Sequence, residues 1–508
     1  MNRLLGTFLL LSCGAAWAQV QGNLGAGAHT WAGPVTVTGD VTIPAGATLT
    51  IQPGAVVTMA ATDGVGSGVA TRVEIFVEGT LNIAGVSGGA VTLTGAVNSN
   101  NAWGGVVVQP GGSATIGHAS FSGMENGLIA RRGGTGTTTQ LTLSNSAISN
   151  SRVGVSNELI SSSGTLTTTL TGVSVSALTG ASVTTGIFQA TDSSFSGGTT
   201  YNFYQTGGVA SLTRVSAVRG RFGLYLFGGG GTTTCDRCTV SFNSLDGIYT
   251  SGVSGGTHST VVTSSVITHN AGLGINRVST AYSTVSLSFS NVWGNSGTAG
   301  PPPSGSANGL TANLSNVSAV LSLDSPNNRS FNPLFADAPN NNFRLTHRSP
   351  SRKSGDSGVD QGALPFTSHL TQGLQGQFWE DATLSGANSV LGDLLVAPGV
   401  TLTISPGASF SFDSDSLGGG LSATKGELIV FGTLSAIGVA GQHLSFSGTG
   451  NGNNAWGGVI VRPGASATIA NASFSGMEFG LSAFRGASPS STQLTLSNSA
   501  ISNSRVGV

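Results

Sequence analysis

Thr139-Gln-Leu-Thr-Leu-Ser-Asn-Ser-Ala-Ile-Ser-Asn-Ser-Arg-Val-Gly-Val155 recurs without a change at Thr492–Val508, at an offset of 353 residues. Leu and Ile alternate with Thr and Ser in its short runs, which is the pattern of strands that bury one side. Asn and Gly separate these runs, as turn residues do. The stretch therefore predicts one unit of a repetitive β-structure that occurs twice in the chain.

Units with the same pattern continue through the first copy. Each unit ends in an apolar anchor residue that follows Gly or, once, Asn202. The anchors are Leu128, Val155, Ala181, Phe203, Leu224, Ile248 and Ile275. Their spacings of 21–27 residues suit one coil of a β-helix with three short strands, whereas a propeller blade needs about 40 residues. The spacing predicts an all-β solenoid.

Asparagines mark a second position in these units. Asn150, Asn243 and Asn270 stand five positions before an anchor, and Asn295 holds the matching place in the next unit. Asn tolerates the left-handed backbone of a tight corner, and stacked side-chain amides can hydrogen-bond along an axis. We interpret these four residues as structural corner residues rather than ligand-binding ones.

Several motifs together resemble a known family. They are Gly39-Asp-Val-Thr-Ile-Pro-Ala-Gly-Ala-Thr-Leu-Thr-Ile-Gln-Pro-Gly54, Trp103-Gly-Gly-Val106, Asn332-Pro-Leu-Phe-Ala-Asp337 and Val359-Asp-Gln-Gly-Ala363. They look like secreted right-handed parallel β-helix proteins of the pectin-lyase-like superfamily. The resemblance implies that fold and its handedness. It does not specify a function, because the superfamily includes lyases, hydrolases, epimerases and adhesins.

The N-terminus has the pattern of a secretion signal. Arg3 is followed by the apolar run Leu4–Leu11 and by Ala16-Trp17-Ala18, a small-x-small cleavage site. A lipoprotein signal that uses Cys13 is the alternative. The apolar run is too short to cross a bilayer, and no later transmembrane segment is expected. The predicted location is secreted or at the cell surface.

The repeats and composition shifts divide the chain. We expect a signal peptide (1–18), a Gly/Ala-rich lead-in (19–30), a first β-helix copy (31–366), a linker (367–377) and the start of an incomplete second copy (378–508).

Charged chemistry is sparse in this sequence. Only 39 of the 508 residues are charged and none form a basic patch, so we expect no nucleic-acid partner. A glycan-cleaving enzyme needs clustered carboxylates. The catalytic candidates are Asp192, Asp236 and Asp246, which lie within a few coils of one another near several arginines. The simpler interpretation is that these aspartates are scattered solvent-facing charges.

Cysteine and tryptophan have structural interpretations. Cys235-Asp-Arg-Cys238 is one CxxC pair, which cannot complete a tetrahedral zinc site. A buried thiol at Cys238 is favoured, and a local disulfide with Cys235 is the alternative. Trp103 and Trp456 are expected to pack in the core, with stacking on a sugar as the alternative. No metal or cofactor is expected.

These observations favour an exported repetitive β-helix with a structural or surface-binding role. Its expected partner is a polysaccharide or another cell-envelope component. A polysaccharide lyase or glycoside hydrolase of the same fold is the alternative. A carboxylate cluster on one face would favour the enzyme, whereas a face of Thr, Ser and Asn would favour the binding protein.

Overall fold

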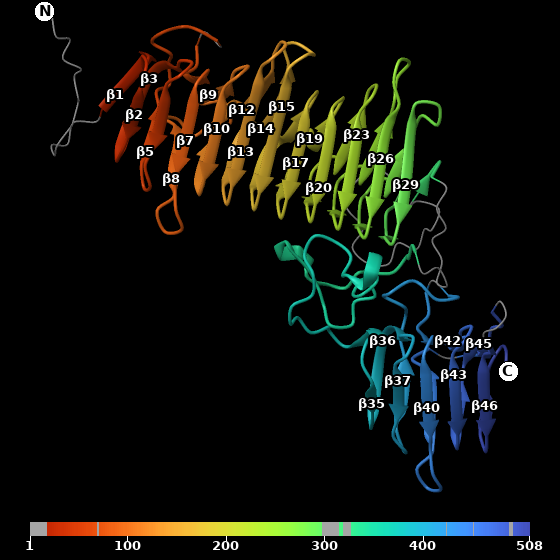
Figure 1. Ribbon diagram of the computed structural model, residues 1–508. Helices are drawn as coiled ribbons and strands as arrows, with labels where there is room; N and C mark the ends of the chain where they lie inside the picture. The colour runs from red at the N-terminus through yellow and green to blue at the C-terminus, as the bar shows by residue number, and fades with distance from the viewer. Residues whose placement is uncertain are drawn as a thin grey trace, which may run out of the picture.

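The computed structural model describes residues 18–68, 71–296, 314–317, 327–422, 424–450, 452–486 and 491–508. The expected signal sequence lies outside these residues, apart from Ala18. The chain forms two stacks of parallel strands with a segment of irregular structure between them (Figure 1). We call them the first stack (18–317) and the second stack (374–508), and residues 331–366 the closing segment.

Each coil of the first stack contributes strands to three faces. Face 1 is an eleven-stranded sheet. Its strands are β2 (Ala28–Trp31), β4 (Thr48–Ile51), β7 (Thr80–Ala84), β10 (Ser113–Gly117), β13 (Thr138–Ser144), β15 (Thr165–Thr171), β17 (Ile187–Thr191), β20 (Val209–Thr213), β23 (Thr232–Asp236), β26 (His258–Thr263) and β29 (Ser283–Ser288).

Faces 2 and 3 form one twenty-stranded sheet, because long strands run around the corner between them. These long strands are β3 (Pro34–Ile43), β14 (Ala147–Leu159) and β16 (Ser174–Val183), and β1 (Ala18–Asn23) pairs with β3. Face 2 has β5 (Val56–Met59), β8 (Val91–Gly95), β11 (Ala119–Ser122), β18 (Ser194–Ser196), β21 (Ser216–Val218), β24 (Thr239–Ser241), β27 (Val266–Thr268) and β30 (Asn291–Trp293). Face 3 has β6 (Glu74–Val77), β9 (Trp103–Val108), β12 (Met124–Arg132), β19 (Tyr201–Gln205), β22 (Leu224–Phe227), β25 (Ile248–Ser251), β28 (Ile275–Arg277) and β31 (Leu314–Ser315).

The seven predicted anchors lie in one row. They pair with one another from coil to coil on face 3, in parallel register and in the predicted order. All seven are buried. Because a single coil cannot bury its apolar side chains alone, stacked neighbours provide the core. The fold is a parallel β-helix, as the spacing predicted.

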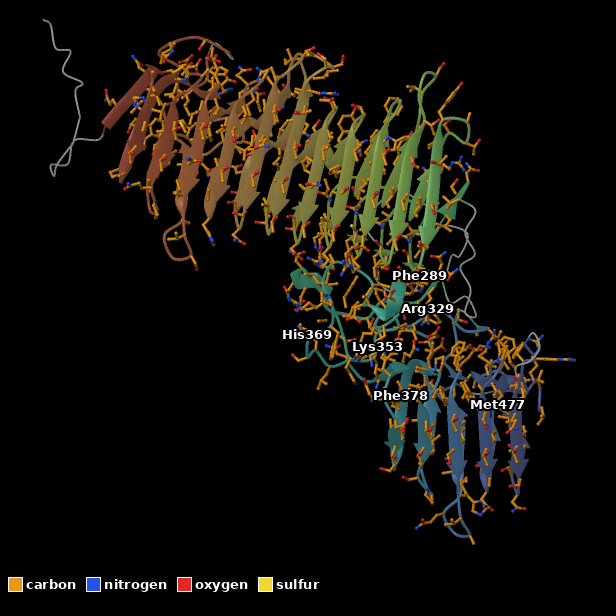
Figure 2. The ribbon with its side chains drawn as sticks, in the orientation of Figure 1. Phe289, Arg329, Lys353, His369, Phe378 and Met477 are labelled. Carbon is orange, nitrogen blue, oxygen red and sulfur yellow. The ribbon has the colours of Figure 1, made fainter. Side chains whose placement is uncertain are left out.

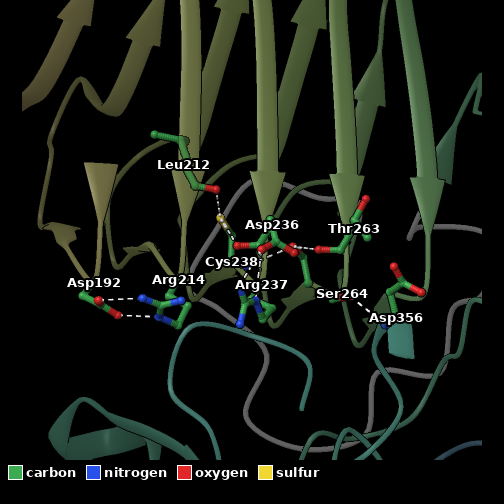
Figure 3. A network of polar contacts seen from close by, with 10 residues as sticks. Asp192, Leu212, Arg214, Asp236, Arg237, Cys238, Thr263, Ser264 and Asp356 are labelled. Carbon is green, nitrogen blue, oxygen red and sulfur yellow. Dashed lines mark hydrogen bonds and ion pairs between the residues drawn. The ribbon is translucent and has the colours of Figure 1, made fainter. Parts of the chain in front are cut away.

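The corner between faces 1 and 2 uses a left-handed residue in successive coils. The row is His118, Asn145, Gly172, Asp192, Arg214, Arg237, Ser264 and Phe289. A left-handed backbone turns the chain within one residue, so its side chain points away from the core. This backbone requirement brings Asp192, Arg214 and Arg237 together on one exposed edge (Figure 3).

The second stack repeats the first over fewer coils. One sheet contains β35 (Ala382–Leu384), β37 (Thr401–Ile404), β40 (Thr433–Ile437), β43 (Ser466–Ala470) and β46 (Gln493–Ser497). The other contains β34 (Leu374–Phe378), β36 (Ala387–Val396), β38 (Ser409–Phe412), β39 (Glu427–Val430), β41 (Leu444–Gly448), β42 (Trp456–Val461), β44 (Ala472–Ser475), β45 (Met477–Ala483) and β47 (Ala500–Ser502). β34 begins inside the stretch expected as a linker, just as β1 and β2 use most of the expected lead-in.

The closing segment lies along face 2 and reaches the second stack. It contains the antiparallel pair β32 (Phe335–Asp337) and β33 (Asn342–Leu345) and two 3-10 turns, Ala338–Asn340 and Asp356–Gly358. The N–H of Gly362 donates to the carbonyl of Ser264 over 2.8 Å, which ties the segment to the first stack. Figure 2 shows Arg329, Lys353 and Phe378 at the junction of the two stacks. Within the described residues no helix is long and apolar enough to cross a membrane.

Candidate functional site

Asp192 and Asp236 are held by arginines on the corner between faces 1 and 2. Oδ1 and Oδ2 of Asp192 accept from Nε and Nη2 of Arg214 over 2.5 and 2.7 Å. Asp236 Oδ2 accepts from Nε and Nη2 of Arg237 over 3.0 and 2.9 Å. The hydrogen bond from Arg214 lowers the pKa of Asp192. A carboxylate held in its ionised form in this way is poorly suited to act as a general acid.

Asp246 lies at a different corner, before β25, and belongs to face 3. Its Oδ1 accepts from the N–H of Leu273 over 2.7 Å and its Oδ2 from Nδ2 of Asn276 over 2.9 Å. Burial raises the pKa of Asp246, and these two hydrogen bonds act against that rise. The structure therefore does not bring the three candidate aspartates together on one face.

A cavity of about 520 Å³ lies beside Asp192, where the closing segment leaves face 2. Arg214, Arg219, Asn341 and Phe343 also line it. Nε of Arg219 donates to Oδ1 of Asn341 over 2.5 Å, so this arginine fastens the closing segment. Both arginines of the cavity already have partners within the chain, and the cavity adds no second carboxylate.

Three of the four predicted asparagines form a buried row at the corner between faces 2 and 3. Nδ2 of Asn243 donates to Oδ1 of Asn270, and Nδ2 of Asn270 donates to Oδ1 of Asn295, both over 2.8 Å. The same oxygens accept the backbone N–H groups of Asn243 and Asn270 over 3.1 and 3.0 Å. Asn202 extends the row by donating to Oδ1 of Asn243 over 3.0 Å.

Asn150 does not belong to this row. Its backbone is left-handed, with φ of 43°, and its exposed amide donates to Oδ1 of Asn98 over 2.8 Å. The strand register aligns Ile148 with Val240, so Asn150 matches Phe242, which is also left-handed, and Ser151 matches Asn243. The later coils have one more residue between this point and the anchor, so counting back from the anchor does not align Asn150 with the buried row. Asn150 is a corner residue with a left-handed backbone, as predicted.

The tryptophans and cysteines are buried. Trp103 and Trp456 are fully enclosed, and their Nε1 groups donate to the carbonyls of Ser122 and Ser475 over 2.8 and 2.9 Å. Neither indole is accessible to a sugar. Cys235 and Cys238 are free thiols in the core. Figure 3 shows Cys238 directed at the carbonyl of Leu212, over 3.4 Å. Over the described ranges, no group of three His, Cys, Asp or Glu residues could hold a metal ion.

A group of half-buried aromatic side chains, of which Phe227 is the most exposed, lies on the outside of face 3. We call it the aromatic cluster, and it consists of Tyr201, Tyr204, Phe222, Tyr225, Phe227 and Tyr249. Strand alternation explains its position, because the residues on either side of Tyr204, Tyr225 and Tyr249 are buried in the core. Tyr204, Tyr225 and Tyr249 are direct partners in three successive coils.

The rings of this cluster are ordered by their mutual contacts. Tyr225 and Tyr249 stack with centroids 4.4 Å apart and an interplanar angle of 2°, and Tyr201 and Tyr204 stack at 4.9 Å and 16°. Stacked rings turn their edges and hydroxyl groups toward solvent. Burial against its neighbours raises the pKa of Tyr225 to about 12. The cluster therefore presents apolar ring surface and a row of hydroxyl groups along the helix axis.

The sequence contains a signal for this cluster. Four of the five tyrosines in the chain belong to it. Tyr204, Tyr225 and Tyr249 each follow an anchor residue directly, so they share one face in neighbouring coils. The in-register partners at the two ends of their row are Ser182 and Asn276, which are polar.

Face 1 presents hydroxyl groups and almost no charge. Its eleven strands contain one Asp, Glu, Lys or Arg residue, Asp236, at the end of β23. Thr142 and Thr169 are outward-facing partners in adjacent coils, and β15 places Thr165, Thr167, Thr169 and Thr171 on its outer side.

The comparisons with known proteins add little to this description. No family model and no curated protein matches the sequence. Among solved structures, the chain is similar to a mutant of AlyGC, an alginate lyase of family PL6, with 10% identity and a TM-score of 0.22 over 90% of this chain and 87% of that chain. A likeness of this size carries no argument about residues or activity. The fold assignment rests on the parallel strand pairing.

Proposed function

We propose that this protein is an exported, non-catalytic β-helix that binds a polysaccharide or another glycan of the cell envelope. The aromatic cluster carries the proposal. Large aromatic side chains rarely gather on a solvent-facing surface, and such groups mark binding sites. The exposed ring edges offer apolar contact to sugars, while tyrosine hydroxyl groups exchange hydrogen bonds with sugar hydroxyl groups.

The simpler explanation is that the rings only stabilise the sheet. Stacked cross-strand aromatic pairs contribute about 0.5–1.5 kcal/mol each. That contribution does not require Phe227, which is 37% exposed at the edge of the cluster. The uncharged hydroxyl groups of face 1 also suit contact with a neutral polymer. Both features favour the binding function.

Binding can be measured with the full chain by affinity electrophoresis in gels that contain pectate, alginate, chondroitin or xylan. Tyr225→Ala and Tyr249→Ala should each weaken retardation in the responsive gel at least about 10-fold, because each truncation removes a central ring. Tyr282→Ala is the matched control, since Tyr282 is 41% exposed and lies outside the cluster. Equal retardation of all variants would reject the cluster as the binding site.

The same polymers test the enzymatic alternative. Each is incubated with the full chain, with and without calcium, and unsaturated or reducing ends are measured. We expect no release of either. Release that Asp236→Ala or Asp246→Ala abolishes would replace the binding function with a lyase or hydrolase.

A further inference from the structure

Phe331, in the closing segment, contacts both stacks. Its backbone N–H donates to Oδ1 of Asn291 over 3.0 Å, and Nδ2 of Asn291 donates to its carbonyl over 2.8 Å. β30 of the first stack therefore holds its backbone. Its side chain is buried on the outside of the second stack, in a cluster with Leu334, Leu395, Leu417, Ile429 and Ile460.

Gly419 makes room for this ring. A Cβ atom at Gly419 would lie 2.0 Å from Cε1 and 2.1 Å from Cδ1 of Phe331. The backbone of Gly419 is not left-handed, so its conformation alone would accept a side chain. The three atoms nearest to such a Cβ atom all belong to the ring of Phe331, so this ring excludes a side chain. The adjacent N–H of Asn332 donates to the carbonyl of Leu417 over 2.8 Å and completes the contact.

The first stack has the same turn with a different residue at this position. Asp63 and Asp415 open the two turns, and Oδ1 of each accepts the N–H two residues later over 2.8 Å. Ser67 and Gly419 each stand four residues after that aspartate, so they are equivalent. A ring placed on the first stack in the manner of Phe331 would meet the side chain of Ser67.

The serine also has a role that the glycine cannot fill. The hydroxyl group of Ser67 donates to Oδ2 of Asp40. The equivalent aspartate of the second stack is Asp393, whose buried Oδ2 has no hydrogen-bond partner within the described residues. An unsatisfied buried oxygen costs about 1–3 kcal/mol. Glycine at position 419 therefore leaves room for the ring of Phe331. It also leaves Asp393 without the hydroxyl hydrogen bond that Ser67 gives to Asp40.

We propose that the outer surface of strands β36, β39 and β42 in the second stack is a docking site for the closing segment of the β-helix module that precedes it, and that Gly419 selects the second stack over the first. Side-chain size at one position then decides the order in which modules join. Val65 of the first stack, which matches the buried Leu417, is 47% exposed within the described residues.

The test gives the second stack the residue of the first. In the full chain, Gly419→Ser should displace Phe331 and speed amide hydrogen exchange at Asn332 by at least about 10-fold, because local opening becomes easier. The new hydroxyl group should at the same time reach Asp393, so amides of strand β39 should exchange no faster than before. General damage to the second stack would instead speed exchange at both places and would overturn the proposal.

Two further variants make the result specific. Gly450→Ser is the matched control, since a Cβ atom there meets its nearest atom at 3.7 Å, an ordinary contact. It should leave exchange at Asn332 unchanged. In a Phe331→Ala background, Gly419→Ser should have little further effect, because the ring that it displaces is gone. The same change in exchange with and without the ring would also overturn the proposal.

Discussion

Nδ2 of Asn202 donates to Oδ1 of Asn243 over 3.0 Å, across an intervening coil. That coil has Gly220 where the later coils have asparagine. A Cβ atom at Gly220 would lie 2.6 Å from both Nδ2 and Oδ1 of Asn202. The side chain of Asn202 therefore fills, from the preceding coil, the place that an asparagine at Gly220 would occupy. Its amide also donates to the carbonyl of Val218 over 3.1 Å.

This arrangement predicts a compensating pair of substitutions. Gly220→Asn alone should lower the free energy of unfolding by about 1–3 kcal/mol through overpacking. Asn202→Gly alone should cost about as much by leaving buried groups unsatisfied. The double variant should recover part of both losses, because the new asparagine takes the vacated place. Urea denaturation of the four proteins measures this, and strictly additive losses would contradict it.

The asparagine row itself should be sensitive to truncation. Asn243→Leu should cost on the order of 1–3 kcal/mol, since Oδ1 of Asn243 accepts the N–H of Gly220 over 2.9 Å in the buried corner. Asn150→Gly is the matched control, because its amide is exposed and glycine keeps the left-handed backbone. It should change stability by less than about 0.5 kcal/mol. An unchanged urea midpoint for Asn243→Leu would count against a stabilising row.

The second stack should lose stability as pH rises. Burial raises the pKa of Glu427 to about 8, and burial together with the charges of Asp415 and Glu427 raises that of Asp393. The unfolded chain releases these protons at lower pH, so the stabilisation is full below about pH 4 and is lost as pH rises toward about 8. We expect a decrease on the order of 1–3 kcal/mol in this window.

Glu427→Gln tests the origin of this decrease, because it removes the titrating group and keeps most of the shape. The free energy of unfolding of the second stack in urea, monitored through hydrogen exchange of the β42 amides, should then depend less on pH. If the unfolding free energy depended on pH equally in wild type and in Glu427→Gln, another group would be responsible for the decrease.

The two thiols should be unreactive in the folded protein. Cys235 and Cys238 are both buried, and the hydrogen bond to Cys238 together with burial raises the pKa of Cys235 well above its ordinary value. Since the thiolate is the reactive form, alkylation by iodoacetamide at about pH 8 should be slow until the chain unfolds. Mass spectrometry with and without urea reports the labelling. Rapid labelling of the native protein would contradict the buried position.

The repeat pattern was sufficient to predict the fold. Buried anchors such as Val155 and Phe203 recur at the length of one coil, and stacking identical strand patterns in parallel is how each coil buries its apolar side. Trp103 and Cys238 were placed in the core from the Trp-Gly-Gly motif and from the resemblance to the pectin-lyase-like superfamily, and both are buried. These are local properties, since alternation along a strand already determines which side chains point inward.

Only the tertiary structure decided the sites. The position of Asn150 depended on a one-residue difference in corner length, which changes register across coils without a mark in the local sequence. The aromatic cluster exists because Tyr204, Tyr225 and Tyr249 are brought into contact by stacking, although 21 and 24 residues separate them along the chain. Phe331 meets Gly419 because the closing segment folds back between the stacks. Contacts between residues far apart in sequence depend on how the coils stack, and a periodic pattern specifies each coil but not which side chains meet across them.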